Sequence, residues 1–374
     1  MRASTRALLI MVLLMAVVGV QAQQSPTFVE RASVPDFSKV EIKTTRLSDD
    51  FYTLEGLGGT REGGTVSVLI GPDGVLLVDA QFAPLTGRLV AAIEKISSKP
   101  IRFLINTHVH ADHTGGNENF AKLGVLIFGR DQLRARLQHP APGPDGSPGK
   151  PSPAGAWPMV TYDGPVAIHV NGEDVHLIPI RSAHTDGDTL VSFPGHDILA
   201  VGDYFRSTGY PFVDLDNGGS LEGLLAGLGE TIALAGPTTK IIPGHGPIVG
   251  RAALVAQRDM VLAVRDRVAA LVSQGKSLEE VIAAKPTASF DAHVPQSAQT
   301  AERFVWWLYT EVKAAQHRAS RAGIPCASRA ENRPLQVVLP SDLLAAIADL
   351  FRGPQCWPCG PIIRAGSRLF SWQR

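Results

Sequence analysis

The sequence has no net charge and little cysteine. Thirty-five basic side chains balance thirty-five acidic ones, so the composition gives no general attraction to nucleic acid or to an anionic membrane. All three cysteines lie in the last fifty residues. Cys356 and Cys359 have a spacing found in redox and zinc motifs, but neither a βαβ context nor four ligands surround them. We therefore expect an incidental pair or a local disulfide.

The first residues are typical of a secretory signal peptide. Two arginines precede a fourteen-residue apolar run at residues 7–20, which is shorter than the roughly 20 residues needed to cross a bilayer. The small residues of "VQA" follow it as a cleavage pattern. Residues 1–22 are predicted to be removed, leaving a periplasmic or secreted chain. No cysteine follows the cleavage point, so we expect no lipid anchor and no stable membrane anchor.

Strand and helix patterns alternate over residues 23–250, which are predicted to form one α/β domain. Residues 64–70 and 75–80, joined by "GPDG", are typical of an antiparallel hairpin. Residues 85–96 carry apolar side chains at helical spacing. The dipeptide Asn171-Gly172 suits a type I′ turn between two further strands. Other buried strands are predicted at residues 101–106, 125–129, 198–201 and 240–242.

A segment rich in proline and glycine interrupts this pattern at residues 139–158. Its composition predicts a mobile loop without regular structure. Two interpretations stay open: a solvated insertion, or a flap that borders the functional site with Trp157 at its tip.

The C-terminal third divides into two parts. Residues 251–317 predict a helical extension packed on the core, with a capping box at Ser277 and Glu280. This extension could also face a homodimer partner, and it shows no basic pair placed for a substrate carboxylate. Residues 318–374 are rich in arginine, proline and glycine and predict a poorly ordered tail.

The stretch "NTHVHADHTGG" concentrates groups that coordinate metals. His108, His110, Asp112 and His113 directly follow the strand predicted at residues 101–106, where open α/β sheets place their ligands. Three other predicted strands deliver metal-binding residue types at the same relative position: His184, Asp203 and His245. This repetition predicts a metal site rather than isolated surface histidines.

Two ligand sets can be drawn from these residues. His108 and His110 are two positions apart, so both can point the same way from an extended segment, with His184 as a third imidazole. Three nitrogen ligands with one open position are typical of catalytic zinc. Asp112, His113 and His245 form a second set, and Asp203 could bridge two ions. Two divalent ions about 3.5–4 Å apart would lower the pKa of water held between them towards 7.

The motifs "THVHADHTGG", "AHTDGD", "GDYF" and "PGHG", in this order, resemble those of the metallo-β-lactamase fold hydrolases. The resemblance spans residues 50–248 and implies an αββα sandwich followed by C-terminal helices, with two ions in a shallow cleft along one sheet edge. It implies two Zn²⁺, with iron and manganese left open.

The resemblance also implies that Asp79, in "LLVDA", supports the histidine loop without binding the metal itself. The alternative is that Asp79 only forms a turn after the strand. The implied ligands are His108, His110 and His184 for one ion, Asp112, His113 and His245 for the other, and Asp203 for both.

The resemblance leaves the substrate open. With an aspartate at position 203, the ligand set resembles that of the glyoxalase thioesterases, acyl-homoserine lactonases, phosphodiesterases and sulfatases. It is less similar to that of the lactamases of this fold. We predict an exported binuclear zinc hydrolase, in which hydroxide held between the ions attacks a small-molecule ester, thioester, lactone or amide, β-lactams included. Asp112 would orient that hydroxide, and Tyr204 is expected to pack rather than to act. The alternative is a non-hydrolytic member, either a mononuclear iron oxygenase of the persulfide dioxygenase type or a metal-dependent binding protein.

Overall fold

The computed structural model describes residues 36–58, 63–142 and 146–321, all within one compact unit of the chain, Met1–Ile324. The predicted signal peptide and the cysteine-containing tail from residue 322 onwards lie outside the described residues. Across the described ranges, helices that combine the length and the apolar character of a membrane span are absent.

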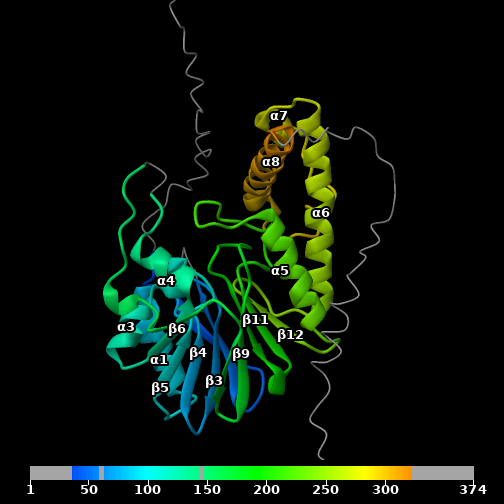
Figure 1. The fold of residues 1–374 in the computed structure, drawn as a ribbon. Helices are drawn as coiled ribbons and strands as arrows, with labels where there is room; N and C mark the ends of the chain where they lie inside the picture. The colour runs from blue at the N-terminus through cyan, green and yellow to red at the C-terminus, as the bar shows by residue number, and fades with distance from the viewer. Residues whose placement is uncertain (1–35, 59–62, 143–145, 322–374) are drawn as a thin grey trace, which may run out of the picture. The chain divides into compact units, whose positions relative to one another are not determined.

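Two β-sheets face each other in the described region (Figure 1). The first sheet has the order β1 to β7, antiparallel from β1 to β4 and parallel from β4 to β7. Its strands are β1 (Glu41–Arg46), β2 (Phe51–Leu57), β3 (Val66–Gly71), β4 (Gly74–Val78), β5 (Ile101–Ile105), β6 (Leu126–Arg130) and β7 (Val160–Tyr162). The hairpin predicted around "GPDG" is confirmed as β3 and β4.

The second sheet has the order β12-β11-β10-β9-β8. Its strands are β8 (Val166–Val170), β9 (Glu173–Pro179), β10 (Thr189–Phe193), β11 (Ile198–Gly202) and β12 (Lys240–Pro243). The predicted Asn-Gly turn joins β8 to β9, and Asn171 and Gly172 have φ angles of 57° and 76°, as a type I′ turn requires. Because β9 and β11 are both antiparallel to β10, and β12 is parallel to β11, the carboxyl ends of β9, β11 and β12 meet at one edge.

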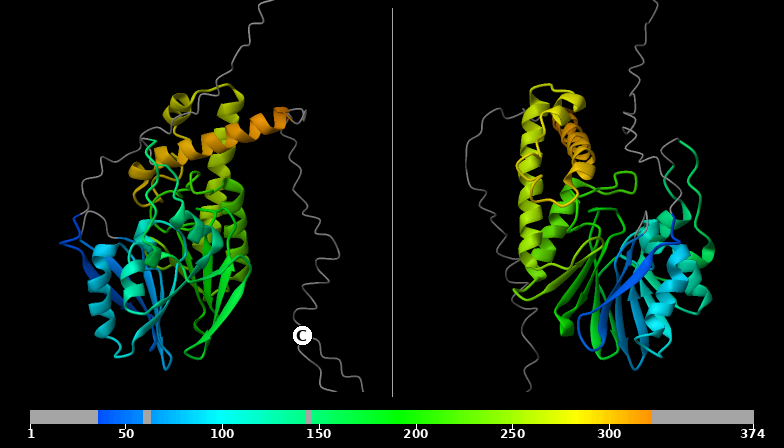
Figure 2. Two further views of the ribbon diagram at one scale, coloured as in Figure 1. Left: turned by 60° about the vertical axis from the view of Figure 1, so that its left-hand side comes forward. Right: turned by 180° about the vertical axis from the view of Figure 1, so that it is seen from behind.

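Helices cover the outer faces of both sheets, which confirms the αββα sandwich. On the first sheet these include α1 (Thr86–Glu94), α3 (Asn117–Lys122) and α4 (Asp131–Gln138), with the short α2 (Ala111–Thr114) at the sheet edge. On the second sheet α5 (Leu221–Leu234) contacts α6 (Arg251–Ser273), and Figure 2 shows α8 (Ser297–Arg321) crossing α6. The predicted capping box is present at the start of α7 (Leu278–Ala283). Short 3-10 turns are η1 (Ala83–Leu85), η2 (Ala154–Ala156) and η3 (Pro194–His196).

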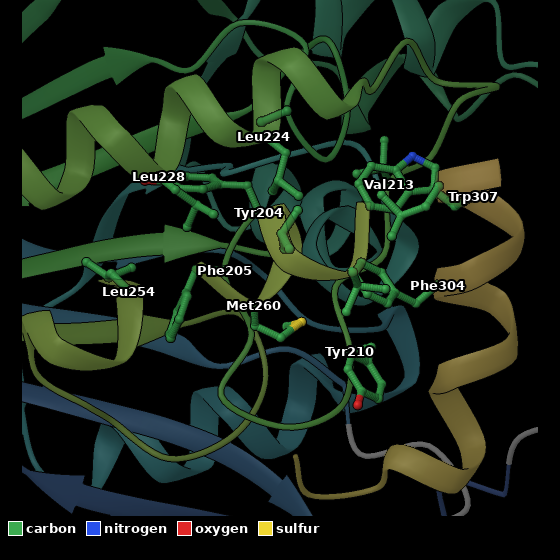
Figure 3. Packing of buried hydrophobic residues seen from close by; sticks show 14 of the residues in the cluster. Tyr204, Phe205, Tyr210, Val213, Leu224, Leu228, Leu254, Met260, Phe304 and Trp307 are labelled. Carbon is green, nitrogen blue, oxygen red and sulfur yellow. The ribbon is translucent and has the colours of Figure 1, made fainter. Parts of the chain in front are cut away.

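Three apolar layers hold these elements together. Between the sheets, Phe51 of β2 meets Phe193 of β10 edge to face, with ring centroids 4.9 Å apart. A second layer joins the first sheet to α1 and α3. A third joins the second sheet to α5, α6 and α8, where Phe304 and Trp307 are buried beside Tyr210 and Val213 (Figure 3). Each large apolar side chain buried in this way stabilises the fold by about 1.5–3 kcal/mol.

Within the segment at residues 139–158, residues 152–157 pack against α3 and α4 beside the first sheet. Asn117 Nδ2 donates to the carbonyl of Ala156 at 2.9 Å, and the Arg134 guanidinium lies 5.5 Å from the Trp157 ring centroid. The indole nitrogen of Trp157 donates to the carbonyl of Ser152. None of the described residues of this segment lines the cavity at the functional site, so the structure does not support the flap interpretation.

Candidate metal centre

The seven ligands expected from the sequence meet at the edge where β5, β9, β11 and β12 end. The loop after β5 carries four of them, and the segments after the other three strands carry one each. They form two groups, and within each group the candidate ligand atoms lie within 4.8 Å of one another. The groups are His108, His110, His184 and Asp203, and Asp112, His113 and His245.

Asp79 fixes the orientation of the His113 ring. The carboxylate of Asp79 lies 2.7 Å from His113 Nδ1 and accepts a hydrogen bond from it. Because a carboxylate accepts hydrogen bonds and does not donate them, Nδ1 carries the proton and Nε2 faces inwards. That Nε2 atom faces the carboxylates of Asp112 and Asp203, at 3.6 and 3.4 Å.

A short relay through Thr107 gives His108 the same tautomer. Thr107 Oγ1 donates to Asp79 at 2.7 Å, so it accepts from His108 Nδ1, which lies 3.0 Å away. The backbone N–H of Thr107 also donates to Asp79, at 2.7 Å. One buried carboxylate therefore sets the protonation of two imidazoles, one in each group.

Two further acceptors orient the remaining rings of the first group. His184 Nδ1 donates to the carbonyl oxygen of Phe212 at 2.7 Å, and His110 Nε2 donates to Asp214 Oδ2 at 2.7 Å. The inward atoms, His184 Nε2 and His110 Nδ1, face each other at 3.0 Å. Two nitrogen lone pairs at that distance repel unless a cation or a proton lies between them.

The inward-facing atoms fit bound cations. Among the described residues, His108 Nε2, His113 Nε2 and Asp203 Oδ1 are buried polar atoms that make no hydrogen bond. Buried polar groups in folded proteins are paired or coordinate a metal, since leaving one unsatisfied costs about 1–3 kcal/mol. Imidazole nitrogen and carboxylate oxygen are ligands of zinc, and also of iron and manganese. The donor set therefore fits divalent metals without identifying one.

Asp203 lies between the two groups. Its Oδ1 is 3.4 Å from His113 Nε2, while its Oδ2 is 3.3 Å from His245 Nε2 and 4.0 Å from His184 Nε2. Gly244 allows this position, because a Cβ on Gly244 would lie 1.9 Å from Asp203 Oδ1. Both oxygens thus face the second group, and Oδ2 also lies towards His184 of the first group, so this carboxylate borders both groups, as a bridging ligand would.

The electrostatics of the site favour the ligand forms of His108, His184 and Asp203, while the neighbouring carboxylates raise the pKa values of His110, His113 and His245. Burial, together with the neighbouring rings of His113 and His184, lowers the pKa of His108, and burial with His110 lowers that of His184 to about 3. Burial alone would raise the pKa of Asp203, but His245 and His113 hold it well below its usual value. The carboxylate of Asp203 is therefore ionised at neutral pH.

Several residues at the site were missed in the sequence. Asp214 and Phe212 lie in the irregular segment between β11 and α5, where no periodic pattern marks them. Asp188 accepts from the His184 backbone N–H at 2.6 Å and from Thr185 Oγ1 at 2.6 Å. It is the last residue of the "AHTDGD" motif, so the sequence did contain a sign of its role.

Tyr204 packs in the apolar layer with its hydroxyl 2.8 Å from Thr231 Oγ1, which confirms the packing interpretation.

A cavity of about 1420 Å³ opens in front of the two groups. Asp112 faces it, with 21% of its side chain exposed against 6% for Asp203. The helical extension contributes to its wall through the start of α8. Lining residues include His110, Asp112, Asp203 and His245 from the sheet edge, Arg206 and Phe212 from the segment after β11, and Thr300 and Arg303 from α8.

Known proteins share this fold and part of this sequence. The chain is 23% identical over 174 residues to the metallo-beta-lactamase type 2 of Elizabethkingia meningoseptica, covering 45% of this chain and 64% of that protein. It is 25% identical over 191 residues to the metallo-beta-lactamase type 2 of Bacillus cereus, covering 50% and 69%. The structure of an inverting sec-alkylsulfatase from Pseudomonas sp. superposes with a TM-score of 0.53 at 16% identity, over 72% of this chain and half of that one. That likeness concerns the fold alone.

A family model gives the broadest match. It describes the metallo-beta-lactamase superfamily and covers residues 59–245, half of the 374-residue chain, from the end of β2 to the last candidate ligand. The matched span contains Asp79 and all seven candidate ligands. The protein belongs to the metallo-β-lactamase superfamily.

Proposed function

We propose that the protein is an exported binuclear zinc hydrolase that cleaves a small carbonyl substrate: an ester, thioester, lactone or amide. The observation that supports this best is the place of Asp203, whose carboxylate borders both groups: it lies 3.4 Å from His113 and 3.3 Å from His245 of one group, and 4.0 Å from His184 of the other. A shared carboxylate holds two cations at one site, and paired divalent ions are the arrangement used by many hydrolases. Export rests on the signal-peptide pattern of residues 1–22.

In this proposal His108, His110 and His184 would hold one ion, and Asp112, His113 and His245 the other, with Asp203 shared. When bound, the ions supply Lewis acidity and a water of lowered pKa. Asp79, Thr107, Asp214 and the Phe212 carbonyl keep the imidazole lone pairs pointing inwards. These partners thus orient the ligand set before any substrate arrives.

Asp112 is the residue we assign to proton handling. Burial raises its pKa, but His113 and His245 outweigh burial and hold the pKa below its usual value, so the carboxylate is ionised at neutral pH. Its Oδ2 lies 3.0 Å from His245 Nε2, and the side chain borders the cavity. There Asp112 can accept a hydrogen bond from the attacking water, orient it and take up its proton.

A hydrolysis panel tests this function. Zinc-loaded mature protein is offered β-lactams, thioesters, lactones and phosphodiesters, and kcat/KM is measured for each. We expect turnover of at least one carbonyl substrate, reduced about 10²- to 10⁴-fold in Asp112→Asn. Oxygen consumption in place of hydrolysis, or turnover unaffected by Asp112→Asn, would contradict the proposal.

A further inference from the structure

The first ligand group depends on two loops that are hydrogen-bonded to each other. The β9–β10 loop, residues 180–188, carries His184, and the segment before α5, residues 212–220, carries Asp214. The Asp214 N–H donates to the carbonyl of His184 at 2.9 Å, and two further backbone hydrogen bonds, at 2.9 and 3.1 Å, join the same loops. A displacement of one loop would therefore displace the other.

The spacing of these loops sets the orientation of two imidazoles. His184 Nδ1 donates across the loops to the carbonyl of Phe212 at 2.7 Å. Asp214 Oδ2 accepts from His110 Nε2 at 2.7 Å. Because a hydrogen bond weakens steeply when its geometry is lost, both rings would lose their orientation if the loops moved.

Arg136, near the end of α4, joins both loops from outside the metal centre. Its Nη2 donates to Asp186 Oδ2 at 2.7 Å, and its Nε lies 3.3 Å from the same oxygen. Its Nη1 donates to the carbonyl of Asp216 at 3.0 Å. One guanidinium thus holds the β9–β10 loop through a side chain and the segment before α5 through its backbone. The planar guanidinium has donors in several fixed directions, so it can hold two acceptors at once.

The packing of α4 brings this guanidinium close to the loops. Leu133 of α4 is fully buried, and a Cβ on Gly187 would lie 3.0 Å from the Leu133 backbone nitrogen. Gly218 has a φ of 77°, and a Cβ there would lie 2.7 Å from Asp186 Oδ2. Small residues at these two positions therefore allow α4 and the Asp186 carboxylate to lie where Arg136 can reach both loops.

The second group is held by other parts of the chain. Asp112 and His113 lie in α2, and His245 follows β12. The His113 ring is oriented by Asp79 rather than by either loop. Loss of the contacts made by the guanidinium on α4 would therefore act on the first group and leave the second in place.

We propose that Arg136 is a positioning residue for the metal ion of the first group. It is not among the residues that line the cavity, and it acts through Asp186 and Asp216, which fix the two loops. The loops in turn fix His184 and the carboxylate that orients His110. This role rests on the metal binding of the proposed function and is independent of the substrate.

Zinc binding tests the proposal. Metal-free mature protein is titrated with zinc against a chelating competitor, and His184→Ala and His245→Ala identify the two binding steps, since each removes a ligand of one group. In Arg136→Gln we expect the step that is lost in His184→Ala to weaken about tenfold. The step that is lost in His245→Ala should keep its wild-type affinity. Arg136→Lys should recover part of the lost affinity, because an ammonium keeps the charge but lacks the planar set of donors.

Arg134→Gln is the matched control, because Arg134 lies on the same helix and contacts a different part of the chain. Its guanidinium donates to the carbonyl of Pro158 and lies 5.5 Å from the Trp157 ring centroid. We expect Arg134→Gln to lower the free energy of unfolding and to leave the affinity for both zinc ions unchanged. A purely structural role for Arg136 would give the same result as this control.

Hydrogen exchange of the metal-free protein follows the loops themselves. The backbone N–H groups of Asp186 and Asp214 should exchange about tenfold faster in Arg136→Gln, and at the wild-type rate in Arg134→Gln. Asp186→Asn breaks the same ion pair from the other side, so it should show the same exchange and the same selective loss of zinc even if Arg136→Gln does not fold.

Wild-type affinity for both ions in Arg136→Gln and Asp186→Asn overturns the proposal, and so does equal weakening of both ions or unchanged exchange of the loops. These measurements use no substrate, so the hydrolase function can fail while the role of Arg136 holds. If the wild type binds a single zinc ion, the two-metal function fails, while the response of that ion to His184→Ala and to Arg136→Gln still decides the role of Arg136.

Discussion

The Asp79 carboxylate accepts a hydrogen bond from His113 Nδ1 at 2.7 Å, and both side chains are buried. Asp79 also accepts two hydrogen bonds from Thr107, which in turn orients His108. One carboxylate therefore orients two imidazoles, so that the free nitrogen of His113 faces one ligand group and that of His108 faces the other. Its φ of 68° is a backbone conformation that Asn and Asp tolerate better than other side chains.

Replacing Asp79 by Asn keeps the shape of the side chain and removes its charge. We expect metal affinity to fall about 10- to 100-fold, because the partner that fixes the His113 tautomer is lost. The free energy of unfolding should fall by about 1–3 kcal/mol, since buried donors lose their acceptor. Zinc competition titration and urea unfolding measure these effects. Wild-type affinity in Asp79→Asn would contradict the supporting role.

Asp214 supports the other group, through His110 Nε2 and through the side chain of Asn217, both at 2.7 Å. We expect Asp214→Ala to weaken binding of one metal ion about 10- to 100-fold while the second ion stays bound. Asp216→Ala, an exposed site in the same segment, is the control and should leave both affinities unchanged. Equal loss of both ions in Asp214→Ala would show that the two groups do not act as separate sites.

Gly244 provides the space that Asp203 occupies. In Gly244→Ala the new methyl group would displace Asp203 Oδ1, so we expect the protein to bind at most one metal ion and to lose hydrolysis. Gly229→Ala in α5 is the matched control, because a Cβ there meets no atom within 4 Å. The control should stabilise α5 by about 0.5–1 kcal/mol and retain both ions. Metal content after gel filtration separates the two variants.

His196 should make the stability of the sandwich depend on pH. Burial lowers its pKa, but hydrogen bonds to Asp50, at 3.0 Å, and to Glu173 outweigh burial and raise it above 6.5. The protonated ring therefore stabilises the folded state below about pH 6.5, and this contribution is lost as the pH rises through the raised pKa.

We expect His196→Gln to lower the free energy of unfolding by about 1–3 kcal/mol at pH 6, and by clearly less at pH 8.5. Urea unfolding of both proteins across this range measures the difference. A difference that stays constant with pH, or grows as the pH rises, would refute the assigned sign.

The sequence predicts much of the sandwich because its strands are bounded by turn residues. The hairpins at "GPDG" and Asn171-Gly172 and the strands before the four ligand positions agree with the structure. These strands end at a common edge, so ligand types that recur at strand ends come together in space. In such a topology, short motifs at the strand ends predict which distant residues lie close together in the fold.

Other features could not be read from local patterns. Helix α5 was missed because its sequence, "LEGLLAGLGETIAL", has apolar residues on all sides and three glycines, so no apolar stripe stands out. The sequence feature that could have indicated α5 is its N-cap residue, Ser220. The Ser220 side chain accepts a hydrogen bond from the Gly223 N–H at 3.0 Å. Asp214 and Arg206 lie in the irregular segment between β11 and α5, which has no periodic pattern. Arg303 reaches the site because of how α8 packs on the core, and a helical pattern in the sequence does not specify that packing.

The metal content of the purified protein tests the two-metal account most directly. The mature chain is dialysed against buffer containing limiting zinc, iron and manganese, and bound metal per chain is measured by inductively coupled plasma mass spectrometry alongside hydrolysis. The account predicts two zinc ions per chain, reduced to one or none in Asp203→Asn with loss of turnover. A single iron ion per chain that is retained in Asp203→Asn, with oxygen uptake and no hydrolysis, would contradict it.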